Sequence, residues 1–145
     1  MVNKQFANAV YVMTMLAIQK NKKTTADEKS EIMNSEQLAV GANTNAVVIR
    51  RLICSLSRAG LIHTTRGKSG GVSLAKDPSL ITLNDIYTAL ELSDTISHNE
   101  KPADKECPVS CAIHQTIMTI SEGSEKALGK YLESQKLSDL IKKIK

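Results

Sequence analysis

Apolar residues recur every three or four positions in several segments of the chain, which is the period of a helix with one buried face. An amphipathic helix over residues 4–19 is predicted by Phe6, Ala9, Val10, Met13 and Ala17. A long polar segment follows this helix. Asn34 then stands three residues before Gln37, which is the spacing of a capping box. We therefore expect a short second helix over residues 35–40.

A third, longer helix is expected directly after the short one. Residues 41–43 suit a tight turn, and Thr44 or Asn45 can cap a helix over residues 46–59 that Gly60 ends. Its apolar stripe consists of Ile49, Leu52, Ile53 and Leu56. Two helices joined by a few residues predict a helix-turn-helix, with the stripe in the core.

A β-hairpin is predicted next. Residues 61–65 are rich in β-branched side chains, and residues 72–74 alternate as a returning strand. The segment between them, RGKSGG at residues 66–71, forms the tip. A solvated turn is one interpretation of this tip. A hairpin that follows a helix-turn-helix is more typical of a wing that contacts DNA.

The second half of the chain predicts further helices around an exposed loop. Thr82 with Asp85 can cap a helix through Leu90 that closes the core against the first helix, and the polar residues 93–106 predict the loop. A long helix from residue 107, with Gly123 as a weak point, is predicted by Val109, Ile113, Ile117, Ile120, Ala127, Leu128 and Tyr131. A short closing helix is predicted by Leu137, Leu140, Ile141 and Ile144. The long helix has more apolar surface than one neighbour can cover, which predicts a symmetric homodimer.

Positive charge is concentrated in the middle of the chain. Its 145 residues include 19 Lys and Arg against 15 Asp and Glu. From Gln37 to Lys76 there are six basic residues and no acidic one, which leaves 13 basic against 15 acidic residues elsewhere. A local, acid-free basic stretch that coincides with a helix-turn-helix predicts double-stranded DNA as the partner.

The outward face of the helix over residues 46–59 suits the major groove of DNA, because it joins small polar groups, an apolar contact and two arginines. We expect the groove-facing residues to be Thr44, Asn45, Val47, Arg50 and Arg51. In the hairpin tip, Arg66 and Lys68 stand among glycines that let the backbone approach a phosphate or a narrow minor groove.

Several other classes of protein are disfavoured. No apolar run reaches the length of about 20 residues that crosses a bilayer, and residues 1–20 mix polar and apolar positions unlike a signal peptide. We therefore expect a cytoplasmic protein without a membrane partner. Three cysteines and no export signal argue against a disulfide framework. Cys54, beside Leu52 and Ile53, is expected to be a small buried hydrophobe.

The segments NTNAVVIRRLICSLSRAGLI and TTRGKSGGVSLAKDPSLITLNDIYTALE, with a cysteine-bearing loop before a long helix, resemble the Rrf2 family of winged-helix transcriptional regulators. The resemblance covers nearly the whole chain. It implies a mainly α fold with a small β-hairpin wing, divided into a DNA-binding domain at residues 1–92, a sensor loop at 93–108, and a dimerisation helix and closing helix at 109–145. It also implies a homodimer that acts as a repressor and binds one promoter half-site with the helix over residues 46–59 of each copy. Arg66 would then reach into the minor groove.

Family members often sense iron–sulfur clusters, nitric oxide or redox state through cysteines close to the start of the dimerisation helix. This chain has Cys107, Cys111 and His114 in that region. If all three are helical, their spacing places them on one face. Three alternatives stay open: sensor thiols at Cys107 and Cys111 without a cofactor, a zinc ion or iron–sulfur cluster held with His114, or inert packing. A regulator rather than an enzyme is predicted. The alternatives are a small thiol- or metal-dependent enzyme and a protein-interaction module that has lost DNA binding.

Overall fold

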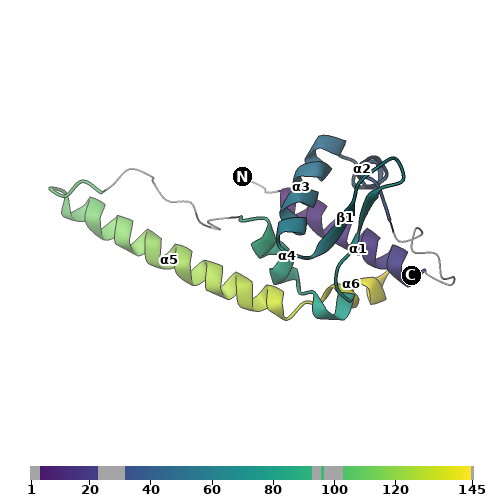
Figure 1. The fold of residues 1–145 in the computed structure, drawn as a ribbon. Helices are drawn as coiled ribbons and strands as arrows, with labels where there is room; N and C mark the ends of the chain where they lie inside the picture. Colours follow the sequence, from purple (N-terminus) through teal and green to yellow (C-terminus); the bar gives the residue numbers. More distant parts are fainter. Residues whose placement is uncertain (1–3, 23–31, 93–95, 97–102, 145) are drawn as a thin grey trace.

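Helices dominate the structure, a computed structural model that describes residues 4–22, 32–92, 96 and 103–144. In chain order the elements are α1 (Lys4–Asn21), α2 (Ser35–Ala42), α3 (Ala46–Arg58), β1 (Ile62–Thr65), β2 (Gly71–Leu74), the 3-10 helix η2 (Pro78–Leu80), α4 (Leu83–Ala89), α5 (Pro108–Glu133) and α6 (Leu137–Lys143). Figure 1 shows a body made of α1–α4, the hairpin and α6, from which α5 extends as a long arm. The predicted fold class, mainly α with a hairpin wing, is confirmed.

Side-chain caps fix where the helices of the body begin. The Asn34 side chain accepts a hydrogen bond from the Gln37 backbone N–H at 2.9 Å, and the Gln37 side chain accepts one from the Asn34 N–H at 3.0 Å. Thr82 and Asp85 form the same reciprocal box at the start of α4. Asn45, not Thr44, caps α3. These signals are local in sequence, and their predicted positions are confirmed.

The end of α2 differs from the prediction. The helix continues through Ala42 instead of ending at Val40. Asn43 follows it in the left-handed conformation, with a φ of 51°, and its N–H donates to the carbonyls of Ala39 and Val40. Asparagine tolerates this conformation better than most residues, so it ends the helix where glycine usually would. Gly41 therefore lies inside the helix and not in the turn.

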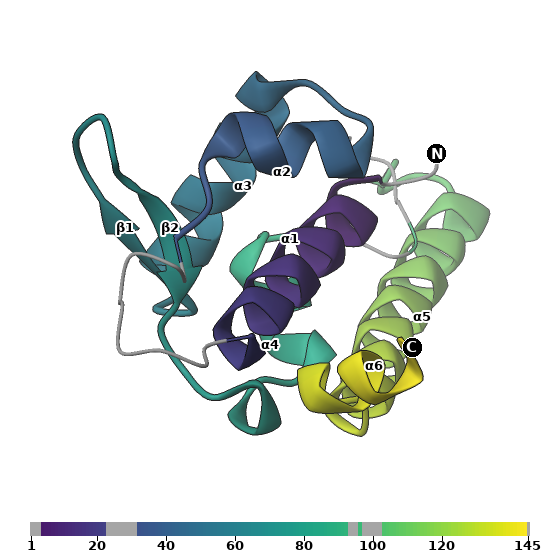
Figure 2. The ribbon, with the colours of Figure 1, turned by 90° about the vertical axis from the view of Figure 1, so that its right-hand side faces the viewer.

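The core surrounds α1, which runs through the middle of the body between the hairpin and α6 in Figure 2. Its buried residues are Ala9, Val12, Met13, Leu16 and Ala17. The predicted stripe of α3 is buried as well, at Ile49, Leu52, Ile53 and Leu56. Phe6 and Tyr87 form an edge-to-face aromatic pair with ring centroids 5.7 Å apart, which joins α1 to α4. The prediction that α4 closes the core against the first helix is confirmed.

The hairpin is tied to the chain that precedes α2. β1 and β2 pair antiparallel from Ile62 opposite Leu74 to Thr65 opposite Gly71. Val72 also exchanges two backbone hydrogen bonds with Met33, of 2.8 and 3.0 Å. The close passage of this segment leaves no room for a β-carbon on Gly71, which would meet the Met33 carbonyl.

The arm α5 is a continuous helix through Gly123 and has few contacts with the body. Ser121 and Leu132 are its buried residues. The Tyr87 hydroxyl lies 3.4 Å from each carboxylate oxygen of Glu125 and links α4 to α5. Within the described residues, no helix combines the length and apolarity needed to cross a bilayer.

After α5 the chain returns to the body. Leu137 of α6 is fully buried, and α6 packs on α1 and η2. Backbone hydrogen bonds from Leu137 N–H to the Ile81 carbonyl (2.9 Å) and from Leu83 N–H to the Gln135 carbonyl (2.8 Å) hold this return in place. The closing helix thus packs with the winged-helix body. The domain limits at residues 92 and 108 stay predictions, because most of residues 93–102 lies outside the described part of the chain.

Candidate nucleic-acid interface

The outward face of α3 is set by the burial of its opposite side. The stripe from Ile49 to Leu56 is packed in the core, so side chains about half a turn away point to solvent. Arg50, Arg51 and Val47 are exposed there, and Val47 is an apolar residue with 48% of its surface accessible. The predicted groove-facing residues of α3 therefore lie on one accessible surface.

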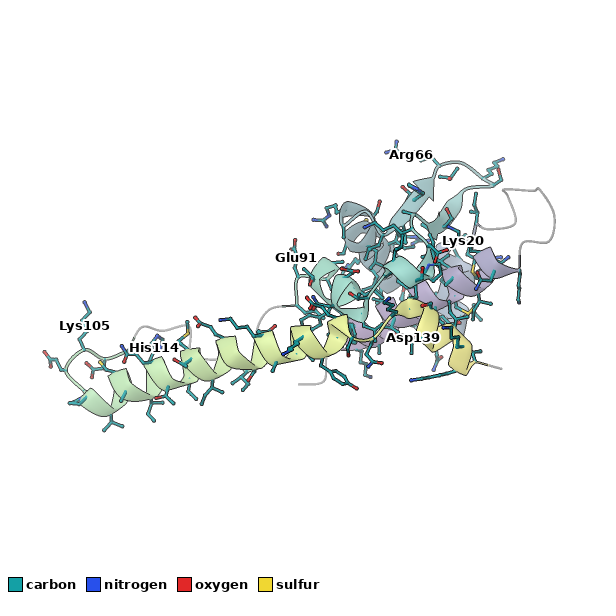
Figure 3. All side chains as sticks on the ribbon, turned by 90° about the horizontal axis from the view of Figure 1, so that it is seen from below. Lys20, Arg66, Glu91, Lys105, His114 and Asp139 are labelled. Carbon is teal, nitrogen blue, oxygen red and sulfur yellow. The ribbon has the colours of Figure 1, made fainter. Side chains whose placement is uncertain are left out.

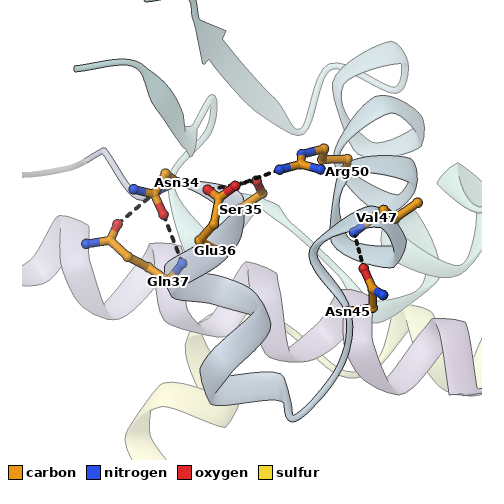
Figure 4. A network of polar contacts seen from close by, with 7 residues as sticks. All are labelled: Asn34, Ser35, Glu36, Gln37, Asn45, Val47 and Arg50. Carbon is orange, nitrogen blue, oxygen red and sulfur yellow. Dashed lines mark hydrogen bonds and ion pairs between the residues drawn. The ribbon is translucent and has the colours of Figure 1, made fainter. Parts of the chain in front are cut away.

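The residues that precede α3 serve its first turn. The Asn45 side chain accepts a hydrogen bond from the Val47 N–H at 2.8 Å, which satisfies a backbone donor that the helix leaves unpaired (Figure 4). Thr44 is partly buried, and its N–H donates to the Ala39 carbonyl at 3.0 Å. Both residues stand at the end of α3 that a major groove would receive, and Asn45 also has a structural role.

The prediction that Cys54 is buried is wrong. Cys54 is exposed on α3. Each residue of an α-helix turns by about 100°, so Cys54 lies roughly 150° from the middle of the buried stripe although Ile53 precedes it in sequence. It shares the outward face with Arg50 and Arg51, one turn further along. The apolar character of its neighbours gave a misleading signal, because helical phase decides burial.

An ion pair connects Arg50 to the start of α2. Arg50 Nη2 lies 2.6 Å from Glu36 Oε1, and both side chains are more than half exposed (Figure 4). The pKa of the Glu36 carboxyl is lowered by a hydrogen bond from its own backbone N–H, and then by the Ser35 hydroxyl and the Arg50 guanidinium. Sequence reasoning missed Glu36, which stands one position before the acid-free stretch that begins at Gln37. No pattern joins residues 14 positions apart on two different helices.

The wing carries the other predicted cations. Arg66 and Lys68 are exposed at the tip of the hairpin, which rises at the same end of the body as the start of α3 (Figures 1 and 2). Gly67, between them, has a φ of +107° and open space around its α-carbon. A β-carbon on Gly70 would meet the Thr65 carbonyl, so that glycine serves the packing of the tip itself. Gly67 is therefore the glycine of the tip at which the backbone is open to a close approach by a partner such as DNA.

The two cysteines near the start of α5 do not stand as the spacing suggested. Cys107 is the N-cap and has extended backbone angles, so the condition that all three residues are helical is not met. Its sulfur accepts a hydrogen bond from the Ser110 N–H at 3.5 Å. Cys111 lies one turn into the helix, and its thiol donates to the Asp104 carbonyl at 3.4 Å. Proline at the next position explains this start, since Pro108 has no N–H to leave unpaired.

Among the described residues, the side chains at the start of α5 do not form a site for a metal or a cluster. In the part of the chain that the structure describes, no three His, Cys, Asp or Glu side chains come together as a metal would require. Cys107, Cys111 and His114 are all within that part. A zinc site generally has four ligands and a cluster generally has four thiolates, and two thiols with one imidazole supply fewer.

The cysteine region around Cys107, Cys111 and His114 is far from the candidate DNA-binding surface of α3 and the wing. Figure 3 shows His114 on the distal part of α5 and Arg66 at the opposite end of the structure. The body and the α4–α5 contacts lie between them. An influence of the thiols on the exposed face of α3 and the wing would therefore have to act over a long distance.

The sequence and the fold are similar to those of a known family. A family model for Rrf2, described as an iron-dependent transcriptional regulator, matches residues 2–143. The chain belongs to the Rrf2 family. YwnA of Bacillus subtilis, named as an HTH-type transcriptional regulator, is 30% identical over 97% of each chain. The HTH-type transcriptional regulator IscR of Cereibacter sphaeroides is 26% identical, over 78% of this chain and 72% of its own.

Solved structures of the family share the fold. CymR, described as the global cysteine regulator of B. subtilis, superposes with a TM-score of 0.65 at 21% identity, over all of this chain and 98% of that one. A crystal structure described as that of a DNA binding protein gives 0.67 at 30% identity, over 94% and 98%. The Rrf2 chain described here is thus a DNA-binding transcriptional regulator with a winged helix-turn-helix.

Proposed function

We propose that this Rrf2 regulator is a homodimeric repressor that reads a promoter site with α3 of each copy in the major groove. The observation that carries the proposal is the outward face of α3. It presents arginines and an apolar residue on a helix whose other side is locked in the core. Bases are read in the major groove by such donors and by contacts to thymine methyl groups. Promoter DNA as the partner would place the protein in the cytoplasm.

The proposal divides the work between α3 and the wing. Asn45, Val47, Arg50 and Arg51, with Thr44 before them, contact base edges or the adjacent phosphates. Arg66 and Lys68 grip the minor groove or the backbone beside it. Both groups lie at one end of the body, so one copy can follow a single stretch of duplex with both.

Dimerisation through α5 follows from its exposed apolar side chains. Val109, Ile113, Ile120 and Tyr131 have 69, 58, 44 and 65% of their surface accessible. With Thr116, Gly123 and Ala127 they follow one another at spacings of three or four residues, which is typical of the seam of a left-handed helix pair. The small residues Gly123 and Ala127 allow the two backbones to approach closely. A second copy supplies the matching seam, because a two-fold axis pairs identical surfaces.

For the signal, we propose the oxidation state of Cys107 and Cys111 without a resident metal. Their thiols are half-buried on adjacent turns at the start of α5, where a disulfide would replace two S–H groups and transfer two electrons and two protons to an oxidant such as a peroxide. It would break the contacts of Cys111 with Asp104 and of Cys107 with Ser110. The start of α5 would then change, and with it the spacing of the two α3 helices.

DNA binding is tested by selecting genomic fragments with the full-length protein and measuring affinity for the enriched duplex at about 0.15 M salt. Arg66→Ala is expected to weaken binding by tenfold or more, with the molecular mass in solution unchanged. The matched control is Lys105→Ala, which removes the same charge from an exposed turn just before α5 and is expected to bind within about twofold of the unsubstituted protein. No enriched fragment, or equal losses in the two variants, would contradict the proposed surface.

The thiol proposal is tested by treating the DNA-bound protein with hydrogen peroxide and then with dithiothreitol. Affinity for the enriched duplex is expected to change at least fivefold and to recover on reduction. Cys107→Ser and Cys111→Ser should each abolish the response, and Cys54→Ser should preserve it. A response that disappears only in Cys54→Ser would place the sensitive thiol on α3 and overturn the proposal.

A further inference from the structure

The ion pair between Glu36 and Arg50 joins the first turn of α2 to the reading face of α3. We propose that Glu36 is a positioning residue for DNA recognition: it holds the Arg50 guanidinium in the orientation that contacts a guanine and keeps it away from non-specific phosphate contacts. The inference rests on the proposed function, since it assigns a role within the same surface.

The position of the Glu36 carboxylate relative to α3 is fixed by the core. Leu38 and Ala39 of α2 are buried against the same cluster as Ile49 of α3, so the two helices cannot slide independently. The capping box of Asn34 and Gln37 fixes the turn on which Glu36 stands. A carboxylate on one rigid helix therefore restrains a long arginine on another. Arginine otherwise loses considerable rotamer freedom when it binds a base.

The geometry leaves Arg50 able to read DNA while it is held. A guanidinium has five N–H donors in a plane, and the contact of 2.6 Å involves Nη2. The remaining donors can form the two parallel hydrogen bonds to O6 and N7 of guanine that are the commonest arginine–base contact. The Glu36 carboxylate thus accepts from a guanidinium N–H that the contact with guanine does not use.

The ion pair has little value for folding stability. Both side chains are more than half exposed, and water screens their attraction. Its effect on DNA binding is larger, because the carboxylate cancels one positive charge on a surface rich in cations. Among the described residues, Arg50 is the cation of this surface for which the structure records an acidic partner. Neutralisation lowers the attraction to any phosphate but preserves a directed contact to one base.

The experiment uses the full-length protein and a library of duplexes with a randomised central segment, sequenced before and after selection. The unsubstituted protein is expected to select guanine at one position of each half-site, and Arg50→Ala to lose that preference. Glu36→Gln should reduce the guanine preference at least fivefold. The Glu36→Gln protein should also bind a fixed non-matching duplex more tightly. The slope of log affinity against log salt concentration should steepen by the amount expected for about one more phosphate contact per subunit.

Two further variants separate positioning from charge. Glu36→Asp keeps the charge but shortens the reach, so it should lose guanine preference without gaining non-specific affinity. Asp139→Asn is the matched control, because Asp139 forms an exposed pair with Lys142 on α6 and its loss alters net charge equally. This variant should behave like the unsubstituted protein. Thermal unfolding of each variant confirms that it is folded.

The outcomes are distinguishable. If the unsubstituted protein selects no sequence, the proposed function fails. If it selects a sequence and Glu36→Gln retains the same guanine preference, the positioning role is wrong and the proposed function stands. If Glu36→Gln changes specificity equally in an Arg50→Ala background, Glu36 acts without Arg50, and the inference is overturned.

Discussion

The body and the α5 arm use apolar residues in opposite ways. In the body, α1 and α3 bury their apolar sides completely against each other and against α4, α6 and the hairpin. On α5, the residues at the seam, Val109, Ile113, Ile120 and Tyr131, remain open to solvent. The body therefore reaches its structure with contacts from one chain. The arm leaves an apolar surface uncovered, and if a second copy covers it, as we propose, the state of the arm depends on protein concentration.

Under the proposed function, the difference would allow one chain to combine a rigid DNA-binding surface with a response to oxidation. The proposed DNA-binding surface of α3 and the wing belongs to the well-packed body, where the caps and the core fix α3 relative to α2 and the wing. The thiols lie at the far end of the arm, where Cys107 and Cys111 are half-buried at the start of α5. A signal there can alter how two bodies are spaced without disturbing either of them.

The largest expected effect comes from breaking the seam. Ile113→Glu combined with Ile120→Glu places four charges in a two-fold interface that has no basic residue at those positions. We expect the mass in solution to fall from twice 15.8 kDa to 15.8 kDa, and operator binding to fall by at least a hundredfold. Sedimentation equilibrium and gel shift measure the two quantities.

The matched control adds the same charge off the seam. Gln115→Glu with Lys126→Gln also changes the net charge by −2, at exposed positions on another side of α5. This variant should remain a dimer. If both double variants dissociate, net charge and not the seam controls association, and the comparison of arm and body fails at this point.

A smaller effect separates the two regions by concentration dependence. Ile49→Ala leaves a cavity in the body and should lower the free energy of unfolding by roughly 2–5 kcal/mol at any protein concentration. Ile113→Ala truncates an exposed residue, so the isolated chain should change by less than about 0.5 kcal/mol. Its effect should grow as protein concentration rises, because the dimer adds stability. Urea unfolding over a range of concentrations tests both, and a concentration-independent loss for Ile113→Ala would contradict the proposed seam.

Two glycines should separate the body and the arm by the sign of their effect on stability. Gly71→Ala forces a β-carbon against the Met33 carbonyl in the body, and we expect a loss of about 1–3 kcal/mol in the free energy of unfolding. Gly123→Ala meets open space on α5. In a background in which the seam is broken, it should gain about 0.5–1 kcal/mol from helix propensity. Thermal unfolding measures both, and opposite signs are the expected result.

Sequence reasoning succeeded where the signal was local. The capping boxes at Asn34 and Thr82, the stop at Gly60 and the stripe of α3 involve residues within one or two helical turns of each other. Such patterns determine where a helix begins, which side it buries and where it ends. The hairpin could be predicted for the same reason, since only five residues separate its two strands.

Errors arose where neighbours in space are distant in sequence or where helical phase mattered. Cys54 was expected inside because adjacent residues are apolar, but it lies on the opposite side of the helix. The long helix was expected from residue 107, and the structure begins it at Pro108 with Cys107 as the cap. The seven groove and wing residues remain predictions, because exposure on a suitable face does not show contact with DNA.

The sequence alone determined the helices, the hairpin, the local positive charge and the family resemblance, because each is written in short spacings or in composition. Only the tertiary structure decided that Glu36 meets Arg50, that Gly71 must pass beside Met33 and that α6 returns to α1. These contacts depend on how whole elements pack around the core. Packing is fixed by the combined shape of many side chains, so no short stretch of sequence records it.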